Sequence, residues 1–241
     1  MRPRSLTTSP APGVGSRYEL PDLLTYAPHR PAPSSLSEKA YWLIRDQIVS
    51  LRLEPGSMIN ERELTSELGL GRTPVREALR RLADENLVVV YPRRGIFVSN
   101  IEARDLATIS EVRAELEGFA ARLAAERASA EERGVCQELI EELEASRSER
   151  DAHKLIHFDQ RIHRHIYRCT HNEFLEATLE EYFVLTLRLW LVVIDRVRRL
   201  DEAVQDHNEL LEAICDADGD RAEVVMRRHV IGFEEAIRAV L

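Results

Sequence analysis

The stretch from residue 60 to residue 98 constrains the fold most, because it carries two helix signals, a turn and a hairpin in a fixed order. Asn60 is a favourable N-cap, and Leu64 and Leu68 are four residues apart, so they share one face of the helix that follows. Glycines in the turn at 69–71 can end this helix, since glycine adopts the left-handed C-cap conformation at little steric cost. These signals predict a short first helix closed by a tight turn.

A second helix is predicted directly after this turn. Thr73 offers an N-cap, and Pro74 suits the first helical position, where no amide donor is needed. The apolar residues recur on the side that we expect to be buried: Val75, Leu79 and Leu82. The arginines fall on the opposite side: Arg72, Arg76 and Arg80. A recognition helix presents its N-terminal residues to base edges, and arginine pairs in a bidentate manner with guanine.

Two short strands are predicted after the second helix, at residues 87–91 and 96–98, because these residues are mostly β-branched or aromatic. Arg93 and Arg94 lie at the hairpin tip, where they can reach phosphates or a minor groove. Arginines on a helix usually form only a solvated face, but the turn, the cap and the hairpin agree here. Helix, turn, helix and hairpin in this order indicate a winged helix-turn-helix that binds double-stranded DNA.

The sequence NERELTSELGLGRTPVREALRRLADENLV, followed by RRGIFV, resembles the GntR family of bacterial transcription regulators. The upstream phrase IRDQIVSLRLEPGSMINE is similar to the family's first helix and Pro-Gly turn, so the resemblance covers roughly residues 38 to 100. It implies DNA-contacting roles for Arg62, Arg72, Arg76, Arg94 and Gly95. We add Thr73, at the start of the second helix, to this predicted DNA-contacting set. Gly71 stands where the family often has serine, which removes one hydroxyl contact to phosphate.

The formal charge of −9 is unevenly distributed along the 241 residues. Residues 1–37 carry +2, residues 38–100 carry +1 and residues 101–241 carry −12. Within residues 71–100, six basic side chains face three acidic ones. Phosphate affinity depends on the local patch, so an acidic total does not argue against nucleic acid.

Three expectations concern the compartment and the chain ends. Cys136, Cys169 and Cys215 are odd in number and lack paired spacing, which favours core thiols in a reducing cytoplasm over disulfides. No apolar run reaches the roughly 18 residues that a membrane span needs, so a cytoplasmic protein without a membrane partner is expected. Residues 1–36 are rich in Pro, Ser, Gly and Thr and are interpreted as a flexible extension.

From Ile101 to the C-terminus the sequence contains no proline and few glycines. Apolar residues recur at spacings of three and four, as in Ile109, Val112 and Leu116. Helices are predicted near 103–127, 130–148, 151–170, 173–197, 201–217 and 220–240. The fold class is therefore mostly α: a winged helix-turn-helix at 37–100 and an all-α bundle of six or seven helices at 101–241.

Four polar residues of the helical part have metal-ligand character. Asp159 and His163 are four apart and project from one helical face, while His207 and His229 lie in later helices. Three imidazoles and one carboxylate are typical of a divalent transition-metal site. The alternative at this point is a buried hydrogen-bonded pair plus two surface histidines.

The sequences EVRAELEGFAARLAAERA, FDQRIHRHIYRCTHN and DHNELLEAICDADGDRAEVVMRRH resemble the FCD effector domain of the FadR-like GntR regulators, over about residues 105 to 235. The resemblance implies a metal held by Asp159, His163, His207 and His229. It also implies that Arg113 faces the effector. Imidazole suits zinc and nickel, and the carboxylate also admits manganese, so zinc is predicted with nickel or manganese as alternatives.

Together these features predict a DNA-binding transcription regulator, not an enzyme. The resemblance implies a repressor, and two reading heads in a homodimer imply an inverted-repeat operator. A small carboxylate effector is expected to bind the metal and Arg113. Two alternatives stay open: a regulator whose effector is the metal itself, and a metal-dependent enzyme that activates water.

Overall fold

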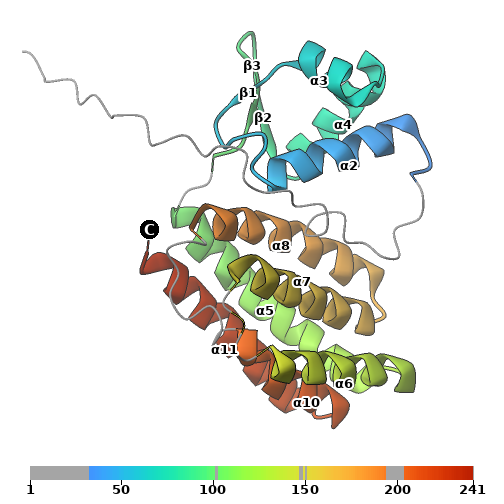
Figure 1. Ribbon diagram of the computed structural model, residues 1–241, viewed down its shortest axis with the longest axis vertical. Helices are drawn as coiled ribbons and strands as arrows, with labels where there is room; N and C mark the ends of the chain where they lie inside the picture. The colour runs from blue at the N-terminus through green and yellow to red at the C-terminus, as the bar shows by residue number, and fades with distance from the viewer. Residues whose placement is uncertain (1–32, 101–102, 147–148, 150, 194–203, 241) are drawn as a thin grey trace, which may run out of the picture.

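The computed structural model describes residues 33–100, 103–146, 149, 151–193 and 204–240. The first 32 residues of the predicted extension lie outside these described residues. A small helix-and-strand domain is stacked on a larger helical domain, with α2 of the first lying over α8 of the second (Figure 1). The predicted fold class is confirmed.

The N-terminal domain consists of α2 (Leu36–Val49), β1 (Met58–Ile59), α3 (Glu61–Leu68), α4 (Arg72–Asp84), β2 (Val88–Tyr91) and β3 (Gly95–Val98). The Asn60 side chain caps α3 by accepting hydrogen bonds from the amides of Arg62 and Glu63. Gly69 ends α3 with φ 62°, in the left-handed region that favours glycine. Both predicted caps of this helix are confirmed.

Two details of this domain differ from the sequence prediction. Helix α4 begins at Arg72 with Gly71 as its N-cap, so Thr73 is not the cap and Pro74 is the third helical residue. Proline is tolerated there because amides of the first turn have no intrahelical acceptor. Strand β1 was not predicted, since two residues carry no periodicity; it pairs with β3 and gives the sheet order β1-β3-β2.

The core of the N-terminal domain forms where α2 and α3 pack on α4. Ile44 and Ile48 of α2 are buried against the predicted apolar side of α4, which comprises Val75, Leu79 and Leu82. This packing leaves the arginine side of α4 exposed. The amphipathic pattern of the second helix therefore decides which of its faces can meet DNA.

The C-terminal domain consists of α5 (Ala103–Arg127), α6 (Ala130–Ala145), α7 (Ala152–Cys169), α8 (Glu173–Val193), α10 (His207–Cys215) and α11 (Gly219–Arg238). Helix α6 ends earlier than predicted, and the predicted helical residues 194–197 and 201–203 lie outside the described part of the chain. Helices α5 and α11 run antiparallel, since Arg122 pairs with Glu223 while Glu115 pairs with Arg227.

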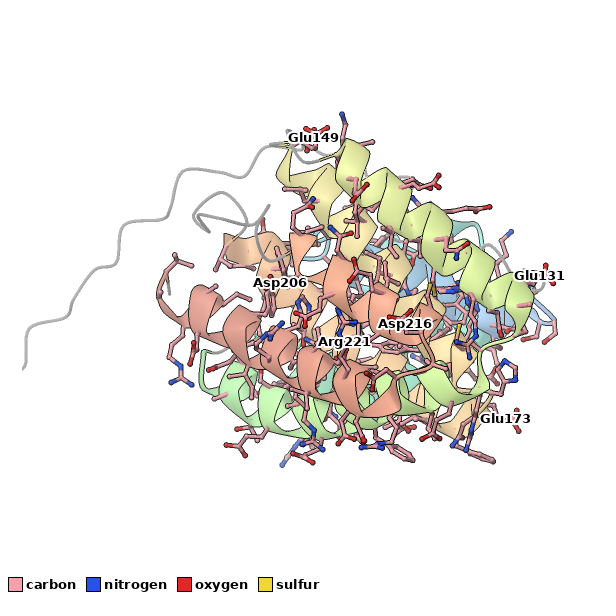
Figure 2. The ribbon with its side chains drawn as sticks, turned by 90° about the horizontal axis from the view of Figure 1, so that it is seen from below. Glu131, Glu149, Glu173, Asp206, Asp216 and Arg221 are labelled. Atoms are coloured by element: carbon pink, nitrogen blue, oxygen red, sulfur yellow. The ribbon has the colours of Figure 1, made fainter. Side chains whose placement is uncertain are left out.

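The acidic surplus of the C-terminal domain lies on its outer surface. Glu131, Glu173 and Asp216 are all exposed, and Figure 2 shows Glu131 and Glu173 at the edge of the helical domain. Arg221 lies near Asp216 and pairs with it at 3.6 Å (Figure 2). None of the helices in the described residues combines the length and the apolar character needed to span a bilayer.

Candidate functional site

The residues predicted to contact DNA are all exposed on the N-terminal domain: Arg62, Arg72, Thr73, Arg76, Arg94 and Gly95. They come from α3, the N-terminal end of α4 and the turn of the β2–β3 hairpin. The hairpin tip and α3 both lie on the side of the domain that faces away from the C-terminal helices (Figure 1). The structure therefore leaves these positions open to a partner.

Local geometry orients two of these arginines. The Arg76 side chain is 67% exposed, and its Nε donates to a carboxylate oxygen of Glu61 on α3 at 2.7 Å. At the hairpin tip, Arg93 has φ 62° and Gly95 has φ 114°, a tight turn that glycine makes without strain. The Arg94 guanidinium lies 5.8 Å from the centre of the Tyr91 ring. Pairing with Glu61 and contact with Tyr91 restrict the two side chains before any ligand binds.

The second site lies inside the C-terminal domain, where the four predicted ligands meet. Asp159 and His163 come from α7, His207 begins α10 and His229 lies on α11. One donor atom from each of the four lies within 4.8 Å of every other, and all four residues are buried. The alternative of two surface histidines is therefore wrong, because α10 and α11 bring both into the interior.

The donor atoms converge at distances that fit one ion. His163 Nε2 lies 3.2 Å from His207 Nε2 and 3.3 Å from His229 Nε2. An Asp159 carboxylate oxygen lies 3.6 Å from His163 Nε2, 3.7 Å from His207 Nε2 and 3.9 Å from His229 Nε2. Ligands at about 2.0–2.1 Å from a tetrahedral ion would be roughly 3.3 Å apart. The spacing of this donor set thus fits a divalent metal.

Acceptor atoms beside the outer ring nitrogens favour the tautomer in which the inward nitrogens carry lone pairs. His163 Nδ1 lies 2.7 Å from a Glu117 carboxylate oxygen, and His207 Nδ1 lies 3.0 Å from the Val204 carbonyl oxygen. Both partners are acceptors, so both Nδ1 atoms donate and, in the neutral rings, both Nε2 atoms carry lone pairs. Two lone pairs facing each other at 3.2 Å repel unless a cation lies between them. The tautomers therefore suit metal ligation.

Burial favours the neutral form of two of the imidazoles. It lowers the pKa of His207 to about 4 and holds the pKa of His229 well below its usual range. Burial would raise the pKa of Glu117, but the Arg113 guanidinium and His163 outweigh it and bring this pKa to about 2. At neutral pH His207 and His229 are therefore unprotonated, which is the form that binds metals.

Glu117 is a functional residue that the sequence alone did not identify. Its position four residues after Arg113 on one helix permits an ion pair with that arginine and indicates no further contact. The pair exists, with Arg113 Nε donating to Glu117 Oε1 at 2.5 Å, but the other carboxylate oxygen faces His163. Glu117 therefore connects the predicted effector arginine to a predicted metal ligand.

A small cavity adjoins the ligands and has room for about one water-sized group. Its lining includes Arg113, Asp159, His163 and His229. The rest of the lining is mostly apolar and comprises Ile156, Phe183, Thr186, Leu187, Trp190, Val230 and Phe233. A mostly apolar lining with a few convergent polar groups is the usual composition of a small-molecule site.

Other polar residues near α7 have structural roles. The His165 side chain is buried away from the ligand set, and its Nε2 lies 3.0 Å from the Glu132 carbonyl oxygen. His171 pairs with the Glu132 carboxylate at 3.0 Å on the surface. Asn172 caps α8, since its side-chain oxygen accepts from the Leu175 amide at 3.2 Å.

A winged helix-turn-helix on a helical domain with a buried Asp/His₃ cluster defines a class of bacterial regulators, and two family models match accordingly. The model described as "Bacterial regulatory proteins, gntR family" matches residues 36–98, and the FCD domain model matches residues 108–232. The chain therefore belongs to the gntR family, carries an FCD domain and is a transcriptional regulator.

Relatives support this assignment. The HTH-type transcriptional repressor RspR of Escherichia coli is 25% identical over 208 residues, covering 85% of this chain and 90% of RspR. A regulator from an unstable DNA locus of Streptomyces ambofaciens is 30% identical, covering 79% of this chain and 80% of its own length. The solved structure of E. coli McbR/YncC superposes with a TM-score of 0.73 at 25% identity, covering 84% of this chain and 97% of McbR.

Proposed function

We propose that this regulator is a cytoplasmic, metal-dependent repressor that responds to a small carboxylate. Asp159, His163, His207 and His229 hold one divalent ion, zinc first, with nickel or manganese as alternatives. The observation that carries the proposal is the convergence of three imidazole nitrogens and one carboxylate beside the Arg113 guanidinium. When bound, the ion supplies positive charge and coordination positions for a carboxylate oxygen.

The residues around the ion have separate tasks. Glu117 orients His163 through its Nδ1 and holds Arg113 in place. Arg113 binds the far end of a carboxylate effector, because a guanidinium makes bidentate contacts with carboxylates. Such a ligand shifts DNA binding only if it binds two arrangements of the protein with different affinity.

The same chain is proposed to act as a homodimer on an inverted-repeat operator. The exposed face of the α5–α11 pair supports this, because Val112 and Phe119 are seven residues apart on α5, and Val224 and Ile231 are seven apart on α11. The antiparallel ion pairs between the two helices bring these four exposed apolar side chains onto one face. A second copy is the occupant that would cover it, since a two-fold operator requires two reading heads.

A second candidate function is a metal sensor in which the ion alone is the effector. The small cavity favours it, since a water-sized space admits an ion's remaining ligand but no organic acid without movement of the wall. The two functions can be separated by measuring how zinc and acids change the affinity of the protein for a DNA duplex. This duplex is first selected from a random library by the protein itself. A metal sensor gives its full response with zinc, whereas a carboxylate receptor that already holds zinc changes its DNA affinity again when an acid from a panel of small carboxylates is added.

Elemental analysis of variants tests the ligand set. His207→Ala should lose the ion, because one of four buried ligands disappears and no neighbouring side chain replaces it. His165→Ala is the control, since it is buried in the same domain and outside the cluster. Both variants should still bind DNA through the N-terminal domain. Loss of metal in His165→Ala with retention in His207→Ala would show that the ligands are misassigned.

A further inference from the structure

Helix α8 contacts both the cavity and the DNA-binding domain. Phe183, Thr186, Leu187 and Trp190 of this helix line the cavity. A neighbouring face of the same helix carries Glu180 and Arg188, which contact residues of the N-terminal domain. In Figure 1, α8 is the helix of the C-terminal domain that lies directly beneath α2. A movement of α8 would therefore alter both the cavity and the contacts with the N-terminal domain.

The contact between the domains is centred on Glu180. Its carboxylate accepts from Arg45 of α2 at 2.9 Å and from Arg164 of α7 at 2.7 and 2.9 Å. The side chains of Arg45 and Arg164 are 6% and 11% exposed and that of Glu180 is 28% exposed, so the two cations are shielded from solvent and the carboxylate between them is partly shielded. Shielded pairs have strict geometry, because separating them leaves a charge unpaired in the interior.

A second contact lies two helical turns further along α8. The Arg188 side chain is 2% exposed and donates to the carbonyl oxygen of Ser99 at 2.8 Å. Ser99 directly follows β3, the last strand of the wing. Helix α8 thus holds the N-terminal domain at α2 and at the end of the wing strand.

The group around Glu180 is also connected to the metal ligands and to the effector arginine. Arg164 is the residue after the ligand His163 on α7. The Phe183 ring has the Arg113 guanidinium at 5.5 Å and the Arg164 guanidinium at 5.8 Å from its centre. A ligand in the cavity that displaces the Phe183 ring would therefore disturb Arg164 and, through Arg164, Glu180.

The size of the cavity requires such a movement. Its space accommodates about one water-sized group, so an organic acid of several atoms can enter only if the wall moves. Four lining residues, Phe183, Thr186, Leu187 and Trp190, belong to α8, which also carries the contacts to the N-terminal domain.

We propose that the Arg45–Glu180–Arg164 group is the coupling element that transmits occupancy of the C-terminal site to the DNA-reading domain. Glu180 and Arg45 are positioning residues: they belong neither to the predicted DNA-contacting set nor to the cavity lining, and they set the orientation of α2 relative to α8. The proposal rests on the proposed function, since it names the regulation of that same site.

The test compares DNA affinity with and without Zn²⁺, on a duplex selected from a random library by the wild-type protein. Arg45→Met removes the contact between the domains and leaves Glu180 paired with Arg164, so no buried carboxylate is stranded. Glu180→Gln removes the negative charge of the same contact, on the α8 side. Lys39→Met is the matched control, because Lys39 is an exposed cation on the same helix.

In the wild type and in Lys39→Met we expect Zn²⁺ to change DNA affinity by about tenfold. In Arg45→Met and Glu180→Gln this ratio should fall to near one, while calorimetric Zn²⁺ affinity stays at the wild-type value. A purely structural role would lower affinity in both conditions and leave the ratio unchanged. A wild-type ratio in both variants would overturn the coupling role.

A second measurement separates failure of the coupling from failure of the proposed function. If the wild type neither binds Zn²⁺ nor responds to it, the proposed function fails. Hydrogen exchange of the metal-free protein then tests whether the Arg45–Glu180–Arg164 group holds the two domains together. Arg45→Met should then raise amide exchange along α2 relative to Lys39→Met. Equal exchange in the two variants would show that the group does not hold the domains together.

Discussion

The role of Glu117 can be tested by Glu117→Gln, which keeps the shape of the side chain and removes its charge. The Glu117 and Arg113 side chains are 0% and 4% exposed, so the substitution leaves a buried guanidinium without its carboxylate. Removing one partner of such a pair costs about 3–5 kcal/mol. The substitution also weakens the acceptor for His163 Nδ1, and loss of such a partner lowers metal affinity by about 10–100-fold.

Glu115→Gln is the matched control on the same helix. The Glu115 side chain is 67% exposed and pairs with Arg227 at the surface, so its loss should cost about 0–1 kcal/mol. It lies outside the ligand cluster and should leave metal affinity unchanged.

Two assays measure these effects. Urea unfolding of chelator-treated protein, followed by circular dichroism, gives the free energy of unfolding without metal. Competition with a chromophoric chelator gives the zinc affinity of the folded protein. Equal zinc affinities of Glu117→Gln, Glu115→Gln and the wild type would refute the argument that Glu117 orients His163. Equal unfolding free energies would refute the argument from its buried pair.

The remaining predictions concern DNA and assembly. Arg76→Ala should weaken binding to the selected duplex by about 1–3 kcal/mol and relax base preference, as fluorescence anisotropy on duplex variants can show; an unchanged preference would remove Arg76 from the reading surface. Arg94→Ala should lower affinity for all sequences and reduce the slope of log affinity against log salt by about one; an unchanged slope would mean that Arg94 contacts no phosphate. Phe119→Asp should shift light scattering from dimer to monomer, while Phe174→Asp, a change at an isolated and 79% exposed ring, should not; a dimeric Phe119→Asp would place the interface elsewhere.

Local signals explain why most of the fold could be predicted from the sequence. The Asn60 cap, the left-handed Gly69 and the apolar side of α4 depend on residues within a turn or two of one another. The same holds for the helical periodicity of the C-terminal domain and for the pairing of Asp159 with His163 on one face of α7. Interactions at three or four residues depend on helix geometry alone, so the sequence is sufficient for them.

The resemblance to known regulators supplied what spacing could not. Nothing in the separation of His163, His207 and His229 along the chain implies that they meet, and a buried pair with two surface histidines was equally consistent with the spacing. The packing of α7, α10 and α11 brings the three imidazoles to within hydrogen-bonding distance. Strand β1 was missed for a related reason, since two residues form a strand only because β3 lies beside them.

By itself, then, the sequence determined the helices and the hairpin, their order and the face that each helix presents, because these follow from neighbours along the chain. Only the tertiary structure decided that Glu117 lies against His163, and that Glu180 lies between Arg45 of one domain and Arg164 of the other. Glu180 and Arg45 are 135 residues apart. Such contacts depend on how whole helices pack, and packing is set by the shapes of many side chains together, which no local pattern records.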